Sequence, residues 1–204
     1  KKGYLIADLQ VEFDKNGSIK ENYKINGFVK QGEIDLFNKL NLSKIDFIFN
    51  IEKNNFRLND LKVFANNNDL LAPEIIVKKK KNQFLISGNV NNKKISLTNS
   101  EIKNLIGANL INLDVHKIDF SSENTFSFGI DKKLRLKNLQ IISKILIDNA
   151  IFLNDFNLKE IFPNSKKKII FKDHQIDLNY KKNTLNLEGS GNLILNEEDI
   201  IEYK

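Results

Sequence analysis

Apolar and polar residues alternate in short runs along most of this chain. In the clearest run, one parity holds the apolar side chains of Ile45, Phe47, Phe49 and Ile51. A period of two is typical of a half-buried β-strand. Turn-like groups rich in Asn, Lys and Gly separate the runs about every ten residues, and the chain has only two prolines. The pattern therefore predicts a mainly β protein, built as an antiparallel meander.

Several local features refine this prediction. Residues 4–13 alternate and predict a half-buried first strand, and Gln31-Gly32 predicts a turn before a separate short run over residues 33–37. Pro73 interrupts residues 70–78, which suits an edge strand or a strand entry. Residues 78–81 are lysines and predict a solvated hairpin end. Attraction of such lysines to anionic lipid headgroups is a second interpretation.

One or two short helical insertions interrupt the β pattern. Thr98, Asn99, Ser100 and Glu101 form a capping-box sequence, which predicts a helix near residues 99–106 with Gly107 as its C′ residue. A second short segment, residues 154–162, ends at Pro163.

The alternation slips by one residue at two places. Leu58 shares no parity with Leu61, and Leu136 shares none with Leu139. Such a slip predicts a bulge or bend in the strand. Because the two segments, LNDLKV and LKNLQI, are alike, the same bend is expected twice.

These two segments belong to a degenerate repeat. A glycine phrase occurs as YKINGFV (23–29), FLISGNV (84–90) and LNLEGSG (185–191), and KIDF occurs at 44–47 and 117–120. The order is the same after the first two glycine phrases: glycine phrase, KIDF, then Leu-x-Asp/Asn-Leu-x-Val/Ile. Internal repetition of this kind predicts a repeat architecture. We divide the chain into a first unit, residues 1–98, and a second unit, residues 99–204, which carries the helical insertions in a sheet continuous with the first.

Composition narrows the function classes. The formal net charge is +6, but nearly all the basic residues are Lys, and Arg57 and Arg135 are the only arginines. Phosphate and base recognition relies on the bidentate arginine fork, so nucleic-acid binding is not expected. The chain has no Cys and no apolar run that approaches a membrane span. It also has no Met and begins with Lys1, so we expect it to be part of a longer protein.

The sequence offers no case for an enzyme, a metal or a cofactor. His116 shares parity with Ile118 and is expected to pack into the apolar side of the sheet, whereas His174 lies in an expected turn. Neither has a partner at metal-ligand spacing. Gly189-Ser190-Gly191 lacks the third glycine of a dinucleotide loop, and residues 193–195 continue as a strand.

The apolar face of such a sheet must be covered. A bent, repeating sheet can close on itself, or it can curl into a groove that takes up a ligand such as an acyl chain. The same side chains would line the groove or form the closed core. They are Ile25, Ile45, Phe47, Phe49, Phe84, Ile86, Phe126 and Phe128.

The phrases YKINGFVKQGEIDLFN, SKIDFIFNI, LNDLKV and FLISGNV resemble the degenerate repeats of the AsmA-like proteins of Gram-negative bacteria. These are inner-membrane-anchored periplasmic proteins with a β-groove, similar in architecture to the eukaryotic bridge-like lipid-transfer proteins. The resemblance covers most of residues 4–92 and is less clear over 113–195. The helical insertions depart from a uniform repeat, which puts a continuous groove through the second unit in doubt.

The resemblance implies a segment of a lipid conduit in outer-membrane biogenesis. It implies a periplasmic location, an anchoring membrane helix outside this segment, and a phospholipid or another acyl lipid as partner. The alternative is a structural or adhesive β-repeat of the cell surface with a closed, dry core.

Overall fold

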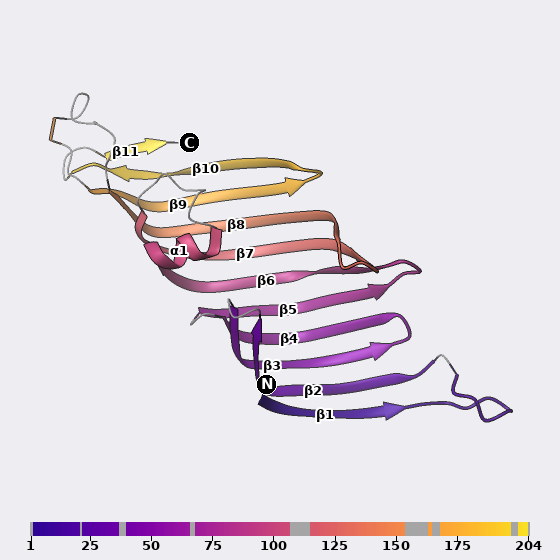
Figure 1. Ribbon diagram of the computed structural model, residues 1–204. Coiled ribbons are helices and arrows are strands. Elements are labelled where there is room, and N and C mark those ends of the chain that lie inside the picture. The colour runs from indigo at the N-terminus through magenta and orange to yellow at the C-terminus, as the bar shows by residue number, and fades with distance from the viewer. Residues whose placement is uncertain are drawn as a thin grey trace. The chain divides into compact units, whose positions relative to one another are not determined.

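A computed structural model describes residues 2–20, 22–36, 40–65, 68–106, 115–153, 163–164, 168–196 and 200–203. Its strands form one antiparallel sheet in which each strand pairs with its neighbours in the chain (Figure 1). The predicted mainly β antiparallel meander is therefore confirmed, and the sheet is open, with β1 and β11 at its ends. The strands are β1 (Lys2–Gln10), β2 (Lys24–Leu36), β3 (Leu40–Glu52), β4 (Asn55–Ala65), β5 (Asn68–Lys79), β6 (Gln83–Thr98), β7 (Val115–Asp131), β8 (Leu136–Leu153), β9 (Lys168–Lys181), β10 (Thr184–Ile194) and β11 (Ile200–Tyr203).

The sequence repeat has a period of four strands. Its glycine phrase lies on β2, β6 and β10, KIDF lies on β3 and β7, and the phrases LNDLKV and LKNLQI lie on β4 and β8. The second repeat is longer in sequence because a helix precedes its KIDF strand and a long connection follows β8. Equivalent phrases thus occupy equivalent strands although their spacing in the chain differs.

The glycine phrases mark places where the backbone of a neighbouring strand comes close. A Cβ added to Gly27 would overlap the carbonyl oxygen of Ile6 and lie 2.6 Å from the ring of Phe49. A Cβ on Gly88 would lie 2.6 Å from the carbonyl oxygen of Glu74. Real Cβ atoms do not approach other atoms this closely, so both positions require glycine.

The slips in alternation correspond to residues with a left-handed backbone inside strands. Asp60 in β4 has φ 53° and Asn138 in β8 has φ 52°, at equivalent positions of the repeat. Gln31 in β2 and Lys44 in β3 adopt the same conformation, with φ 52° and 50°. Each such residue turns the side chains that follow it to the opposite face and bends its strand. The prediction that the repeat copies a bend is confirmed.

The prediction of a turn at Gln31-Gly32 is wrong. Both residues lie inside β2, so residues 33–36 continue the same strand and do not form a separate one. The Gln31 backbone N–H donates to Asp46 Oδ1 at 2.8 Å, and Asp46 also accepts from Lys30 Nζ at 3.0 Å. Asp46 on β3 thereby holds the bulge, and these bonds, the Gln31 backbone bond foremost, lower the pKa of its carboxyl group.

Two further strand predictions are corrected. Pro73 lies neither on an edge strand nor at a strand entry, because β5 pairs with both β4 and β6. The β5–β6 register shifts between Leu71 and Ile75, so a bulge next to Pro73 accommodates its missing N–H. β1 is exposed along its whole length and is not half-buried, because it has a neighbour on one side only.

The capping box is present as predicted. Helix α1 (Asn99–Ile106) follows Thr98, whose backbone N–H and hydroxyl both donate to Glu101 Oε2 at 2.8 Å. These two bonds lower the pKa of the Glu101 carboxyl group. Gly107 and the second helical segment, residues 154–162, lie outside the described residues.

The structure divides into two compact units, called unit 1 and unit 2, whose bounds differ from those of the two repeat units in the sequence. Unit 1 comprises Lys1–Asn92, Asn124–Ile142 and Tyr180–Thr184, and unit 2 comprises Lys93–Glu123, Ser143–Asn179 and Leu185–Lys204. Every described residue of unit 1 belongs to a strand of the sheet or to a connection between strands, and α1 lies in unit 2.

Candidate functional site

Unit 1 has an apolar face that follows directly from the strand register. Cross-strand partners share a face of a sheet. Two rows of partners cross β2, β3, β4, β5 and β6 on this face. One row is Ile25, Ile51, Phe56, Val77 and Ile86, and the other is Gly27, Phe49, Leu58, Ile75 and Gly88.

The structure brings the predicted lining residues together on this face. Ile25, Phe49 and Ile86 belong to the two rows. Phe47 and Phe84 lie two positions from a row residue on the same strand, and Ile45 lies four positions from Phe49, so all three share this face. Phe126 and Phe128 lie on β7. The hydroxyl of Thr125 donates to Asn89 Oδ1 at 2.9 Å, which places Thr125 on the face opposite Gly88. Phe126 and Phe128 therefore lie on the apolar face.

The apolar face remains substantially exposed. Ile45 and Phe49 are buried, each with 6% of its surface exposed. Phe84 is 44% exposed, and the other predicted lining residues are half-buried. Since the described part of unit 1 consists of this single sheet, no second layer within it covers the face.

The aromatic side chains of this face contact one another. The ring centroids of Phe47 and Phe49 are 6.1 Å apart, those of Phe49 and Phe56 are 6.3 Å apart, and those of Phe126 and Phe128 are 5.9 Å apart. These separations are typical of favourable aromatic pairs. The rings form an ordered apolar platform, which costs little additional entropy when a ligand binds.

The opposite face of unit 1 is more polar. Its central row contains Asn26, Asn50, Arg57, Ile76 and Ser87, and the first two side chains are hydrogen-bonded to each other.

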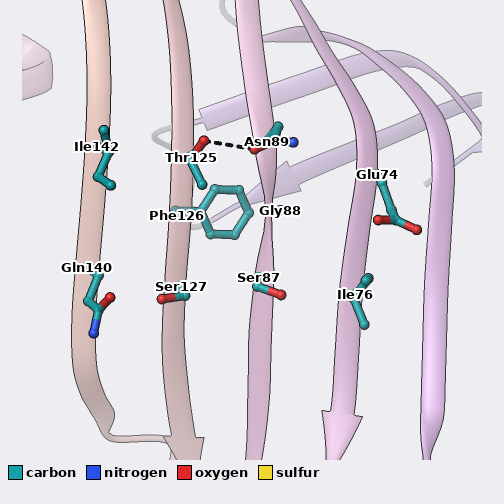
Figure 2. Close-up of a pocket in the computed structure, with 10 residues that line it drawn as sticks. All are labelled: Glu74, Ile76, Ser87, Gly88, Asn89, Thr125, Phe126, Ser127, Gln140 and Ile142. Atoms are coloured by element: carbon teal, nitrogen blue, oxygen red, sulfur yellow. Dashed lines mark hydrogen bonds between the residues drawn. The ribbon is translucent and has the colours of Figure 1, made fainter.

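A hollow of about 300 Å³ lies on this polar face between β5 and β8 (Figure 2). Figure 2 shows Ser87, Thr125 and Ser127 along it and the ring of Phe126 beside Gly88. Its lining combines side chains that carry hydroxyl, amide or carboxylate groups with the apolar side chains of Ile76, Phe126 and Ile142.

Unit 2 contains an aromatic cluster around His174. The His174 ring centroid is 5.0 Å from that of Phe171 and 5.2 Å from that of Tyr203, and a Cβ on Gly191 would lie 2.5 Å from the imidazole. The expected turn at His174 is wrong: the residue lies within β9. The preceding Asp173, with φ 54°, forms a bulge there. Gly191 is the residue in the sequence that could have indicated the burial of His174, because its lack of a side chain makes room for the ring.

The imidazole of His174 is almost completely buried. It is 2% exposed, and neither ring nitrogen has a hydrogen-bond partner among the described residues. Burial lowers the pKa of the imidazole, against smaller opposite effects of the Lys172 backbone and the Asp173 carboxylate. Burial also raises the pKa of the Tyr203 hydroxyl.

The expected packing of His116 is wrong. Its side chain is exposed, and the neighbouring Val115 is buried instead. β7 begins at Val115. At this end of the strand, Val115 is buried and His116 is exposed, whereas the alternation of residues 116–120 predicts the reverse.

The described residues show neither a metal-ligand cluster nor a membrane-spanning helix. They contain no group of three or more His, Asp or Glu residues that could hold a metal ion. None of the helices they form has the length and apolar character required to cross a bilayer. β10 runs through Gly189 and Gly191 as a continuous strand, so the short glycine motif forms no phosphate-binding loop.

No protein-family model, curated protein or solved structure matches this chain.

Proposed function

We propose that this chain binds the acyl chains of lipids on the apolar face of unit 1 and is a segment of a lipid-transport protein. The observation that carries the proposal is the continuous pair of apolar rows across β2–β6 with no second layer over them in the described part of unit 1. Monomeric proteins rarely leave such a surface exposed without a ligand or partner.

The dimensions of the face suit a hydrocarbon chain. Neighbouring strands lie about 4.8 Å apart, so the rows across β2–β6 extend roughly 19 Å. One leaflet of a bilayer holds about 15 Å of hydrocarbon. Covering half the surface of a 16-carbon chain, at about 0.8 kcal/mol per buried methylene, would contribute roughly 6 kcal/mol.

The cellular setting of this proposal comes from the resemblance to AsmA-like repeats. On that basis we propose that the chain lies in the periplasm, is connected to the inner membrane through a segment outside this sequence, and takes part in outer-membrane biogenesis. The alternative, an adhesive β-repeat, would require a closed, dry core. The partly exposed apolar side chains of unit 1 favour the lipid-binding proposal.

Two neighbouring residues of β3 allow a matched test. Phe47 lies on the apolar face, and Ile48, which is 52% exposed, lies on the opposite face. Lipid that copurifies with the wild type after mild extraction would be quantified by mass spectrometry. We expect Phe47→Glu to remove it and Ile48→Glu to retain it, because a carboxylate on the apolar face would have to be desolvated by the bound chain.

The free energy of unfolding of both variants would be measured in urea. Lipid retention lost in proportion to stability would identify Phe47 as an ordinary core residue, and lipid-free wild-type protein would reject the proposed function.

A further inference from the structure

The turns at one edge of unit 1 concentrate positive charge. Because the sheet is an antiparallel meander, the connections from odd- to even-numbered strands all lie at the same end of the strands. The connections after β3, β5, β7 and β9 are tight turns that belong to unit 1 (Figure 1). We call these turns the hairpin edge. Its basic residues are Lys53, Lys78, Lys79, Lys80, Lys81, Lys132, Lys133, Arg135, Lys181 and Lys182.

The lysines of this edge are available to a partner. All of them are exposed, and none forms an ion pair with another described residue. Arg135 differs, since its guanidinium contacts Asp131 Oδ2 at 2.8 Å. Like charges gathered along one edge repel one another, and an anionic partner would relieve this repulsion.

An apolar side chain lies among these cations. Leu134, in the turn between β7 and β8, is 84% exposed and lies between Lys133 and Arg135. Asp131 organises this turn: its Oδ1 accepts from the backbone N–H groups of Lys133 and Arg135 at 2.9 and 3.0 Å. These bonds, that of Arg135 foremost, lower the pKa of Asp131, and the turn holds Leu134 at its tip.

Three of the four turns have a tip residue that their geometry does not favour. Lys53, Leu134 and Lys182 have φ values of 51°, 58° and 51°, a left-handed conformation that Gly or Asn adopts at lower cost. Asn183, with φ 62°, shows the residue type that such a turn normally uses. A lysine or a leucine at these positions therefore costs conformational free energy, and the stability of the fold does not explain why such residues are present there.

We propose that the hairpin edge docks on an anionic lipid bilayer, with its lysines among the headgroups and Leu134 inserted at the interface. Cations combined with an exposed apolar side chain are typical of interfacial membrane binding. Nucleic acid fits less well, because an aliphatic tip offers no stacking surface or hydrogen bond to a base, and the only arginine of this edge is already paired. This inference uses residues separate from the apolar face and does not depend on acyl-chain binding there.

A turn-optimised variant tests the inference without risk to folding. We would combine Lys53→Asn, Leu134→Asn and Lys182→Asn, which relieves the left-handed strain and is expected to preserve or raise stability. The control, Lys93→Gln with Lys144→Gln, removes the same number of positive charges from exposed positions in unit 2. Binding would be measured by cosedimentation with phosphatidylcholine vesicles that contain or lack phosphatidylglycerol.

We expect the wild type to bind only the vesicles that contain phosphatidylglycerol, and less as salt rises. The turn-optimised variant should bind about 100-fold more weakly than the wild type, because the loss of each of its two lysines is expected to weaken binding about fivefold and the loss of Leu134 several-fold. The control should lose less than about fivefold. Equal losses in the two variants would overturn the inference, as would no vesicle binding by the wild type. Tighter binding of the wild type to duplex DNA, unaffected by Leu134→Asn alone, would overturn it in favour of a nucleic-acid partner.

Discussion

At the scale of single residues, small side chains in unit 1 make room for large neighbours. The Phe49 ring lies over Gly27, and this contact lets β1, β2 and β3 approach closely on the apolar face. Gly129 differs, because the nearest atom to its added Cβ would be the flexible Gln83 side chain at 3.2 Å. The same substitution is therefore expected to destabilise the protein at Gly27 and to be nearly neutral at Gly129.

We expect Gly27→Ala to lower the free energy of unfolding by about 2 kcal/mol or more, because the new methyl group overlaps the Ile6 backbone and the Phe49 ring. Gly129→Ala should be within about 0.5 kcal/mol of the wild type, because Gln83 can move. Urea denaturation followed by circular dichroism measures both. A neutral Gly27→Ala would show that the strands do not pack this closely.

His174 predicts a pH dependence of stability. Its pKa is lowered in the folded chain, so between the folded pKa and the unfolded value of about 6.5 the unfolded chain binds more protons. The stability contributed by neutral His174 is present above the unfolded pKa and is lost as the pH falls through this window toward the folded pKa.

The free energy of unfolding should therefore decrease from about pH 7.5 to about pH 5.5 in the wild type and in His116→Gln. His174→Phe keeps a ring against Phe171 and Tyr203 without a titrating group, and the decrease over this range should become smaller. A slope unchanged by His174→Phe would show that other groups cause the pH dependence.

At the scale of elements, the left-handed residues inside strands determine where each strand bends. Asp60 and Asn138 occupy equivalent positions on β4 and β8 and have the same backbone conformation, although they lie in different copies of the repeat. Asn and Asp tolerate this conformation better than other residues that carry a side chain. The bend is thus encoded by one residue per strand.

We expect Asp60→Gly to raise the free energy of unfolding slightly, and Asp60→Val to lower it by about 1–2 kcal/mol, because a β-branched residue resists a positive φ. Lys62→Val, at an exposed position two residues further along β4, should change it by less than about 0.5 kcal/mol. Thermal unfolding would give all three values. If Asp60→Val is as mild as Lys62→Val, the bend does not depend on this residue.

The sequence predicted the strands, the capping box and the repeated bend because each depends on local periodicity or on one short motif. It failed where a turn-like residue pair lies inside a strand: Gln31-Gly32 and Asp173-His174 form bulges that only the neighbouring strands stabilise. The exposure of β1 and the burial of His174 were missed for a related reason, because both depend on which strand lies alongside. The shared face of Phe47, Phe84 and Phe126 followed from alternation, whereas the hairpin edge required the strand order.

At the scale of the whole molecule, the sheet has more apolar surface than its own layer can bury. The side chains of the apolar rows of unit 1 are only partly buried, and no second layer covers them in the described part of this unit. A chain of this kind gains stability from any partner that covers the rows, by mass action. Lipid binding on the apolar face and docking through the hairpin edge use different parts of unit 1 and can be separated by mutation.

The most direct test is to crosslink the purified chain to a phospholipid that carries a photoactivatable group on its acyl chain and to map the modified residues by mass spectrometry. The account predicts labels on apolar-face residues such as Phe47, Ile86 and Phe128. It also predicts far fewer on Ile48 and Ile76, which are apolar but lie on the opposite face of the same sheet. Equal labelling of the two faces, or no labelling above that of the unfolded chain, would contradict it.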